Sequence, residues 1–243
     1  MDRIVAGSAL AAAALLAGCT SGTALTSVDV SDHNVFVPSA RVSFDIGRGR
    51  AERPSELHEG SAIELEASTA KGTGGQSLGP GALPILFAGQ SFNGPQQLSS
   101  EFDFKYAGAA WRWRRFFGDG RFGFEALAGL AIVGLDVTFA SPSQRAQRGL
   151  DSSGGIVGVG LLWRIRPSTS AQARLTWYGS PSGDDVSRAD RLDLHLVQAL
   201  GRHAAVRVGY SAWDLRTDMS SPPAFSNVNV RFAGPALGLE LMF

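Results

Sequence analysis

The sequence predicts an all-β fold, a closed antiparallel transmembrane β-barrel with short periplasmic turns and long extracellular loops. After residue 38, apolar residues alternate with polar or small ones, as in Val206-Arg207-Val208-Gly209-Tyr210, and this is the period of a β-strand. Gly, Pro, Ser and Asn gather between these segments, as they do in exposed connections. The connections alternate between short and long, which is typical of a barrel in the bacterial outer membrane.

The composition excludes several other classes of protein. The 243 residues include 22 Lys and Arg and 22 Asp and Glu, so the net charge is zero and no nucleic-acid partner is expected. Hydrophobic residues make up 44% of the chain, which is too many for a disordered protein. The single cysteine excludes a disulfide framework and a cysteine-based zinc site. The body of the chain has no apolar run that could form a membrane-spanning helix.

A targeting signal occupies the N-terminus. Met1-Asp2-Arg3 carries one arginine, and the apolar segment 4–17 is too short for a stable membrane-spanning helix. The segment Leu16-Ala17-Gly18-Cys19 resembles a bacterial lipobox, which implies cleavage before Cys19 and attachment of a diacylglycerol and an N-acyl chain to it. Thr20 in place of Asp implies export to the outer membrane. An ordinary signal peptide with a chance cysteine is the alternative.

The chain is expected to divide into a signal peptide (1–18), a periplasmic tether (19–38) and a barrel (39–243). Nine segments have strand character, and eight strands are preferred. Segment 61–70 is assigned to a hairpin with about 84–92 inside the first long loop, and if both span the membrane the count is ten. The eight predicted strands are 39–50, 99–115, 121–139, 154–166, 170–180, 188–200, 204–216 and 230–243.

An even number of strands follows from where the two ends of the chain are expected. A lipid on Cys19 would hold the N-terminus at the periplasmic face. The terminal segment 239–243 alternates and ends in Phe243, which resembles the assembly signal of outer-membrane barrels, so the C-terminus is expected at the same face. Three short turns then lie on the periplasmic side, at 118–120, 167–169 and 201–203.

The aromatic residues within 100–115 change phase along the segment. A β-bulge near Gly108 would account for the change, and an inward-facing tryptophan is the alternative. Phe102, Phe104 and Tyr106 occupy even positions, whereas Trp111 and Trp113 occupy odd positions.

Alternation alone does not show which face is apolar, since soluble lipocalins also alternate. Aromatic residues near both ends of the strands favour an outward apolar face, because they form the girdles of membrane barrels. The opposite face is not lysine-rich, and no Gly-x-Trp typical of lipocalins lies near the first strand. The expected girdles are Trp111, Trp113, Phe116, Phe117, Phe122, Phe124, Trp163 and Phe243 near the turns, and Phe139, Trp177, Tyr178 and Trp213 near the loops.

Charged residues of both signs are expected to fill the interior, because an eight-stranded barrel has no room for an open channel. Mutual ion pairing would offset the cost of burying them, which predicts a structural plug. A gated ion path or an anion site is the alternative. The inward candidates are Asp45, Asp103, Lys105, Arg112, Arg114, Glu125, Asp136, Arg164, Arg166, Arg174, Asp193, His195, Arg207 and Glu240.

The sequence contains no recognisable set of catalytic residues. Outer-membrane lipid A 3-O-deacylases use a His-x-Ser pair, but neither His195 nor His203 is followed by it. Asp184-Asp185 is a paired acid of the kind omptin proteases need, but no histidine has an evident position beside it. The chain is therefore expected not to be an enzyme and to bind neither a metal nor a cofactor, apart from the covalent lipid on Cys19.

The body of the chain resembles small outer-membrane barrels such as the transmembrane domain of outer membrane protein A, here joined to a lipoprotein N-terminus. The resemblance implies a Gram-negative outer-membrane protein with a structural or surface-interaction role. A porin-like passage for small apolar solutes or ions, and less readily a lipid A-modifying enzyme, are the alternatives. The implied partners are outer-membrane lipids and lipopolysaccharide, the barrel-assembly and lipoprotein-export machineries, and an unidentified extracellular ligand.

Overall fold

The computed structural model describes residues 28–243 except 33, 47–58, 119, 182–185 and 218–226. Over these residues the chain is all-β, as predicted. No helix in this part of the chain is long and apolar enough to cross a membrane. The predicted signal peptide, Cys19 and the paired acid Asp184-Asp185 lie outside the described residues.

Ten of the twelve described strands belong to one sheet, and the other two form a small hairpin. The strands are β1 (Val28–Asp32), β2 (Val37–Ile46), β3 (Gly60–Leu78), β4 (Ile85–Phe87), β5 (Gln90–Phe92), β6 (Gln96–Phe117), β7 (Phe122–Ala140), β8 (Arg145–Arg166), β9 (Thr169–Gly179), β10 (Val186–Ala199), β11 (Ala204–Thr217) and β12 (Val228–Met242).

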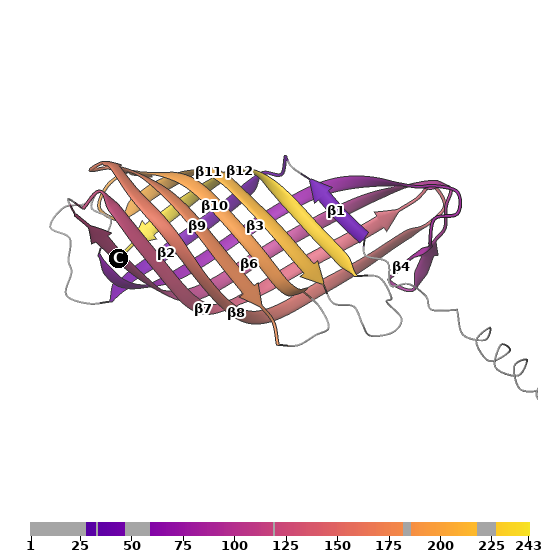
Figure 1. Cartoon of the computed structure of the whole chain (residues 1–243), viewed down its shortest axis with the longest axis horizontal. Helices are drawn as coiled ribbons and strands as arrows, with labels where there is room; N and C mark the ends of the chain where they lie inside the picture. The colour runs from indigo at the N-terminus through magenta and orange to yellow at the C-terminus, as the bar shows by residue number, and fades with distance from the viewer. Residues whose placement is uncertain (1–27, 33, 47–58, 119, 182–185, 218–226) are drawn as a thin grey trace, which may run out of the picture.

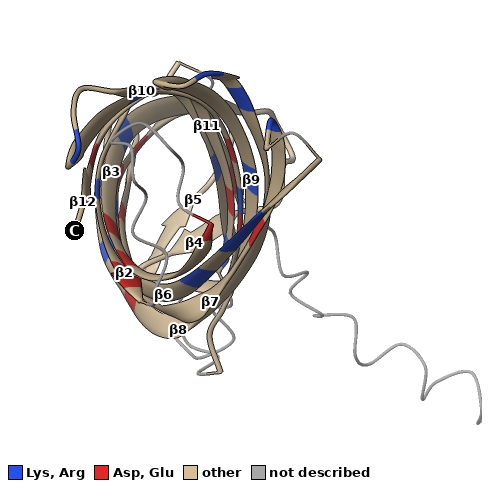
Figure 2. Ribbon diagram, turned by 90° about the vertical axis from the view of Figure 1, so that its left-hand side faces the viewer, with Lys and Arg blue, Asp and Glu red and all other residues tan. Residues whose placement is uncertain are grey.

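Nine strands of the large sheet form a closed ring (Figure 2). Neighbours are antiparallel from β2 through β3, β6, β7, β8, β9, β10 and β11 to β12, and β12 then pairs with β2 in parallel. β1 pairs with the start of β12, with Val28 opposite Val228, and β2 pairs with the rest, with Val37 opposite Ala236. Residues 28–32, which the sequence places in the tether, are therefore part of the sheet, and β1 and β2 together form one interrupted first strand.

The predicted count of eight strands, with ten as the alternative, is wrong. The additional ring member is β3, which pairs with β2 on one side and β6 on the other. Segment 61–70 is therefore not a loop hairpin, and 84–92 folds on itself as β4 and β5. An even number is required only if both ends of the chain lie at one face. The parallel pair that closes this ring allows an odd number.

The ring is strongly staggered. Residues of each strand are paired with residues of the next strand, so a path of pairs can be traced once around the ring. The path that starts at Leu241 in β12 passes Val42 in β2 and Gly155 in β8. It returns to β12 at Asn229. This shift from 241 to 229 is twelve residues over nine strands, which corresponds to a strand tilt of roughly 45°.

The two ends of the ring differ. The short connections after β6, β8 and β10 lie at one end, together with the C-terminal Phe243, and we call this the turn end (Figure 1). At the opposite loop end, β3, β6, β7 and β8, with 19 to 22 residues each, project beyond β9 to β12, with 11 to 15. Residues 145–153, which lie between two of the predicted strands, form the first part of β8.

Strand β6 contains no bulge at Gly108. Its register with β3 and β7 is unbroken, and its even residues face the interior along the whole strand. Phe104 is therefore buried, whereas Trp111 is exposed on the outer face. Neither a bulge nor an inward tryptophan explains the change of phase. The interior itself changes from apolar to charged along the strand.

The predicted aromatic girdle is present only at the turn end. Most of its members there are exposed, but the expected girdle at the loop end faces the interior, except for Trp177. These rings pack against the apolar interior of the loop half instead of lying on the outer surface. The exposed rings at the turn end include Trp111, Phe117, Phe122, Trp163 and Phe243, and the buried rings at the loop end are Phe139, Tyr178 and Trp213.

Candidate functional site: a buried charge network

The inner and outer faces of the ring change character at the same level. On β7, the outward side chains are apolar from Phe122 to Ile132, and Asp136 follows in the projecting part. The inward side chains of that strand begin with Glu125 and end with Phe139. The outward side chains of β3, β6 and β8 also change from apolar to polar toward the loop end, and the inward charges of β3 and β6 lie in the turn half. The turn half is thus charged inside and apolar outside, and the loop half is the reverse.

Two carboxylates form one centre of the interior network. Glu64 accepts Arg112 Nη1 at 2.9 Å and Arg174 Nη1 at 2.5 Å, and Arg41 Nε lies at 3.1 Å. Glu125 accepts Arg114 Nε at 2.8 Å and Arg174 Nε at 2.6 Å. Arg174 therefore joins the two carboxylates. All these side chains are almost fully buried, a position that charged groups occupy only when paired.

A second centre lies around Glu66 and Asp193. Glu66 accepts Arg191 Nη2 at 2.8 Å and Arg41 Nη2 at 3.3 Å. Asp193 lies 2.8 Å from Arg191 Nε and accepts Ser211 Oγ at 2.7 Å. Arg41 thus bridges the two centres.

Glu240 and Arg207 complete the network. Glu240 lies 3.7 Å from Arg112 Nη1 and 3.9 Å from Arg41 Nη1. Arg207 lies 3.6 Å from Glu66 Oε1 and donates from Nη2 to His195 Nδ1 at 3.1 Å. Six arginines and five carboxylates are buried among the described residues, so the charges nearly cancel within the interior.

The structure brings eight of the fourteen predicted inward residues into this network. They are Arg112, Arg114, Glu125, Arg174, Asp193, His195, Arg207 and Glu240.

The other predicted interior residues lie elsewhere. Lys105 is on the outer face of the projecting part, 3.6 Å from Asp136, and Asp103 lies 2.7 Å from Lys71 there. Asp45 and Arg166 are exposed near the turn end, and Arg164 is half-buried over the ring of Phe116 at 4.8 Å. These positions lie beyond the charged part of the interior, either above it or at its rim.

Four members of the network were not expected from the sequence. Glu64 and Glu66 alternate with Ile63 and Leu65, which is the signal that identified the other strands, but their segment was assigned to a loop. Arg41 sits in a predicted strand opposite apolar neighbours, and Arg191 does so in another. The alternation at these two positions would have identified both. The four residues are Arg41, Glu64, Glu66 and Arg191.

Apolar side chains fill the interior above the network. The guanidinium of Arg191 lies 4.7 Å from the ring centre of Trp213, which marks the boundary. The ring of Phe104 packs on Trp213 at 4.7 Å and on Phe232 at 5.1 Å. Farther toward the loop end, Phe87 of the β4–β5 hairpin packs on Phe139 at 4.7 Å, edge to face. The hairpin thus belongs to the packed interior.

The network pairs charges with one another. His195 Nδ1 must accept from Arg207, because a guanidinium only donates. Among the described residues no hydrogen bond joins a hydroxyl group to His195, and no group of three or more His, Cys, Asp or Glu side chains could hold a metal ion. In the described part of the chain, the ion pairs of the network join side chains of eight of the nine ring strands, all except β8.

Comparison of the chain with models of protein families, with curated proteins and with solved structures found no match. The fold and the network define the class directly: an all-β protein whose closed sheet is charged inside and apolar outside over its turn half.

Proposed function

We propose that this chain is an outer-membrane β-barrel lipoprotein with a structural or surface-interaction role, whose lumen is plugged by the Arg, Asp and Glu network. The observation that carries the proposal is the simultaneous inversion of the inner and outer faces. On β7, the outward apolar stretch from Phe122 to Ile132 covers ten residue steps, or about 24 Å at a 45° tilt. This matches the apolar band of about 25 Å on transmembrane barrels.

The exposed side chains of this band support contact with lipid. Leu130 is 71% exposed, Leu161 66% and Leu239 60%, on three different strands. A water-soluble protein rarely exposes a continuous apolar surface of this extent. Beyond the band, the outer face of the projecting strands is polar, which suits water.

The projecting part provides the surface-interaction role. Its outer face carries both lysines of the chain, each in an ion pair: Lys71 with Asp103 at 2.7 Å, and Lys105 with Asp136 at 3.6 Å. Its apolar interior makes it a rigid platform, so a macromolecular ligand would meet a preformed polar surface.

The membrane assignment is tested by removing the lipid. A Cys19→Ser variant is expressed with its signal peptide in a Gram-negative host. We expect it to stay in the outer membrane after alkaline washing, to need detergent for extraction, and to run faster on a gel unheated than after boiling. A variant that dissolves in detergent-free buffer as a folded monomer would refute the proposal.

A plugged lumen makes a further prediction about conduction. Charged side chains fill the turn half and aromatic rings fill the loop half, so no discrete conductance is expected in planar bilayers. Stepwise openings would instead support the passage for ions or small solutes. An unchanged lipid A profile, measured by mass spectrometry with and without the protein, is expected as well.

The entry point of the chain revises where the lipid anchor is proposed to lie. β1 starts at the loop end, because it runs parallel to β12, and β12 ends at the turn end. Cys19 precedes Val28 by nine residues, which reach about 30 Å when extended. The turn-end level at Phe243 lies about 35 Å from Val28, since fifteen tilted residue steps separate Val228 from Phe243. We therefore place the acyl chains in the leaflet at the loop end.

A further inference from the structure

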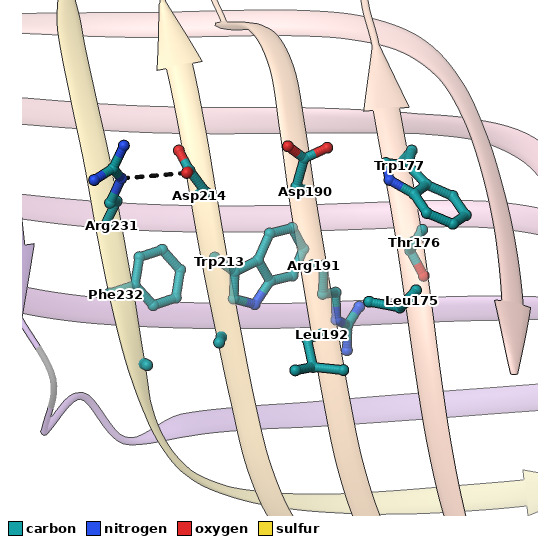
Figure 3. Close-up of a pocket in the computed structure, with 12 residues that line it drawn as sticks. Leu175, Thr176, Trp177, Asp190, Arg191, Leu192, Trp213, Asp214, Arg231 and Phe232 are labelled. Carbon is teal, nitrogen blue, oxygen red and sulfur yellow. Dashed lines mark hydrogen bonds and ion pairs between the residues drawn. The ribbon is translucent and has the colours of Figure 1, made fainter. Parts of the chain in front are cut away.

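A groove of about 310 Å³ lies on the outer face of β9 to β12, where the apolar band ends (Figure 3). Leu175, Leu192, Ala212 and Ala233 are cross-strand neighbours on four consecutive strands and form its apolar floor. The hollow lies over the two alanines, because their side chains are smaller than those of the neighbouring leucines. The floor faces outward, away from the charge network.

The upper edge of the groove is polar. Figure 3 shows Trp177, Asp190, Asp214 and Arg231 in one line across the four strands, and these residues are cross-strand neighbours in the register. Arg188 and Arg216 follow two residues farther toward the loop end on β10 and β11. The groove therefore crosses the line between the apolar band and the polar surface.

Three arginines at this edge, Arg188, Arg216 and Arg231, each contact an aspartate through Nε. Arg188 Nε lies 3.2 Å from Asp190, Arg231 Nε lies 3.2 Å from Asp214, and Arg216 Nε lies 3.8 Å from Asp214. Each pair uses Nε, and among the described residues no ion pair occupies the terminal amino groups, which a ligand could contact. The arginine side chains are 50 to 54% exposed, and three guanidinium groups share two carboxylates.

We propose that this groove binds a lipopolysaccharide molecule of the leaflet at the loop end, with an acyl chain on the alanine-lined floor and a phosphate group on the arginine rim. A guanidinium presents paired donors that match phosphate oxygens, and the rim lies at the level where a leaflet places its phosphates. Trp177 beside the groove suits the same interfacial level. The proposal rests on the proposed membrane location and names a lipid partner of that surface.

The binding test uses the full-length protein in detergent and native mass spectrometry, with three probes: bisphosphorylated lipid A, dephosphorylated lipid A and phosphatidylglycerol. We expect the wild-type protein to retain lipid A, and the double variant Arg216→Gln/Arg231→Gln to bind it at least about tenfold more weakly, since charge-assisted hydrogen bonds are lost. Ala212→Phe, which fills the floor without changing charge, is expected to weaken binding as well.

A matched control removes an exposed arginine on the far side of the ring. Arg145→Gln, which loses only a 3.7 Å pair with Glu101, is expected to bind lipid A as the wild type does. Equal retention of dephosphorylated lipid A or of phosphatidylglycerol would overturn the proposal, and so would an equal loss in Arg145→Gln. Heat-modifiable gel mobility of every variant keeps the two proposals apart: folded barrels that bind no lipid A refute the groove alone, and a protein that never enters membranes refutes both.

Discussion

Arg174 shows at the level of single residues why the interior is held together by charge. Its guanidinium contacts Glu64 on one side and Glu125 on the other, and all three side chains are almost completely buried. Burying ions costs several kcal/mol each unless they are well paired. Because Arg174 pairs with more than one carboxylate, the loss of one partner leaves buried charge that is no longer balanced.

Glu125→Gln is therefore expected to lower the free energy of unfolding by about 3–5 kcal/mol, the cost of breaking a buried pair. The substitution keeps the size of the side chain but removes the charge opposite Arg114 and Arg174. Guanidinium-induced unfolding in lipid vesicles, followed by tryptophan fluorescence, measures this change.

Glu101→Gln provides the matched control. Glu101 pairs with Arg145 at 3.7 Å, and both side chains are more than 60% exposed, so a change of about 0–1 kcal/mol is expected. If the two substitutions cost the same, the interior charges are not held as a paired network.

At the level of residues, the structure buries charged residues that alternate with apolar neighbours inside the band. Arg174, Asp193 and Glu240 are such cases, and all three are buried. Lys105 was misplaced, because the inference assumed that one face of a strand stays polar along its whole length. In β6 the inward face is charged near the turns and aromatic near the loops, and alternation alone does not reveal that change.

At the level of elements, β3 is the ring strand that the sequence did not predict. Its turn-end half alternates as the other strands do, but the residues from Gly72 to Ser77 are only Gly, Thr, Gln and Ser. That composition resembles a loop. The segment forms a strand because its backbone hydrogen bonds are shared with β2 and β6, a non-local pairing that composition does not show.

The position of β3 in the band can be tested with Leu65→Arg. Leu65 faces outward next to Glu64 and Glu66, and an arginine on the lipid face near the middle of a bilayer costs about 2–4 kcal/mol. We expect unfolding in lipid vesicles to show this loss. The same assay in detergent should show a smaller one.

Ser77→Arg is the control on the same strand and the same face. Ser77 is exposed near the loop end, beyond the apolar band, and surface substitutions of this kind change stability by about 0.5 kcal/mol or less. Equal costs for the two arginines would mean that β3 does not face lipid.

For the whole molecule, the parallel pair of β2 and β12 decides the topology. The sequence predicted the all-β class and the three short turns correctly, because both depend on local patterns. The number of strands depended on which face the N-terminus enters, and no local pattern reports that. The pairing of Val37 with Ala236 joins residues almost two hundred positions apart, and Val28 and Phe243 lie at opposite ends of the ring.

With the proposed membrane location and the loop end facing outward, the segment before Val28 is expected to be accessible from outside the cell. A protease site inserted directly before Val28 is expected to be cut in intact cells, whereas the same site in the turn at Gly201-Arg202, at the turn end, is expected to be cut only after the outer membrane is permeabilised. Immunoblotting of the two proteins measures cleavage. The reason is the odd number of ring strands: nine strands lead from Val28 at the loop end to Phe243 at the turn end. A protected site before Val28, together with cleavage at Gly201-Arg202 in intact cells, would show the reverse orientation, and equal exposure of both sites would contradict a ring that spans the membrane.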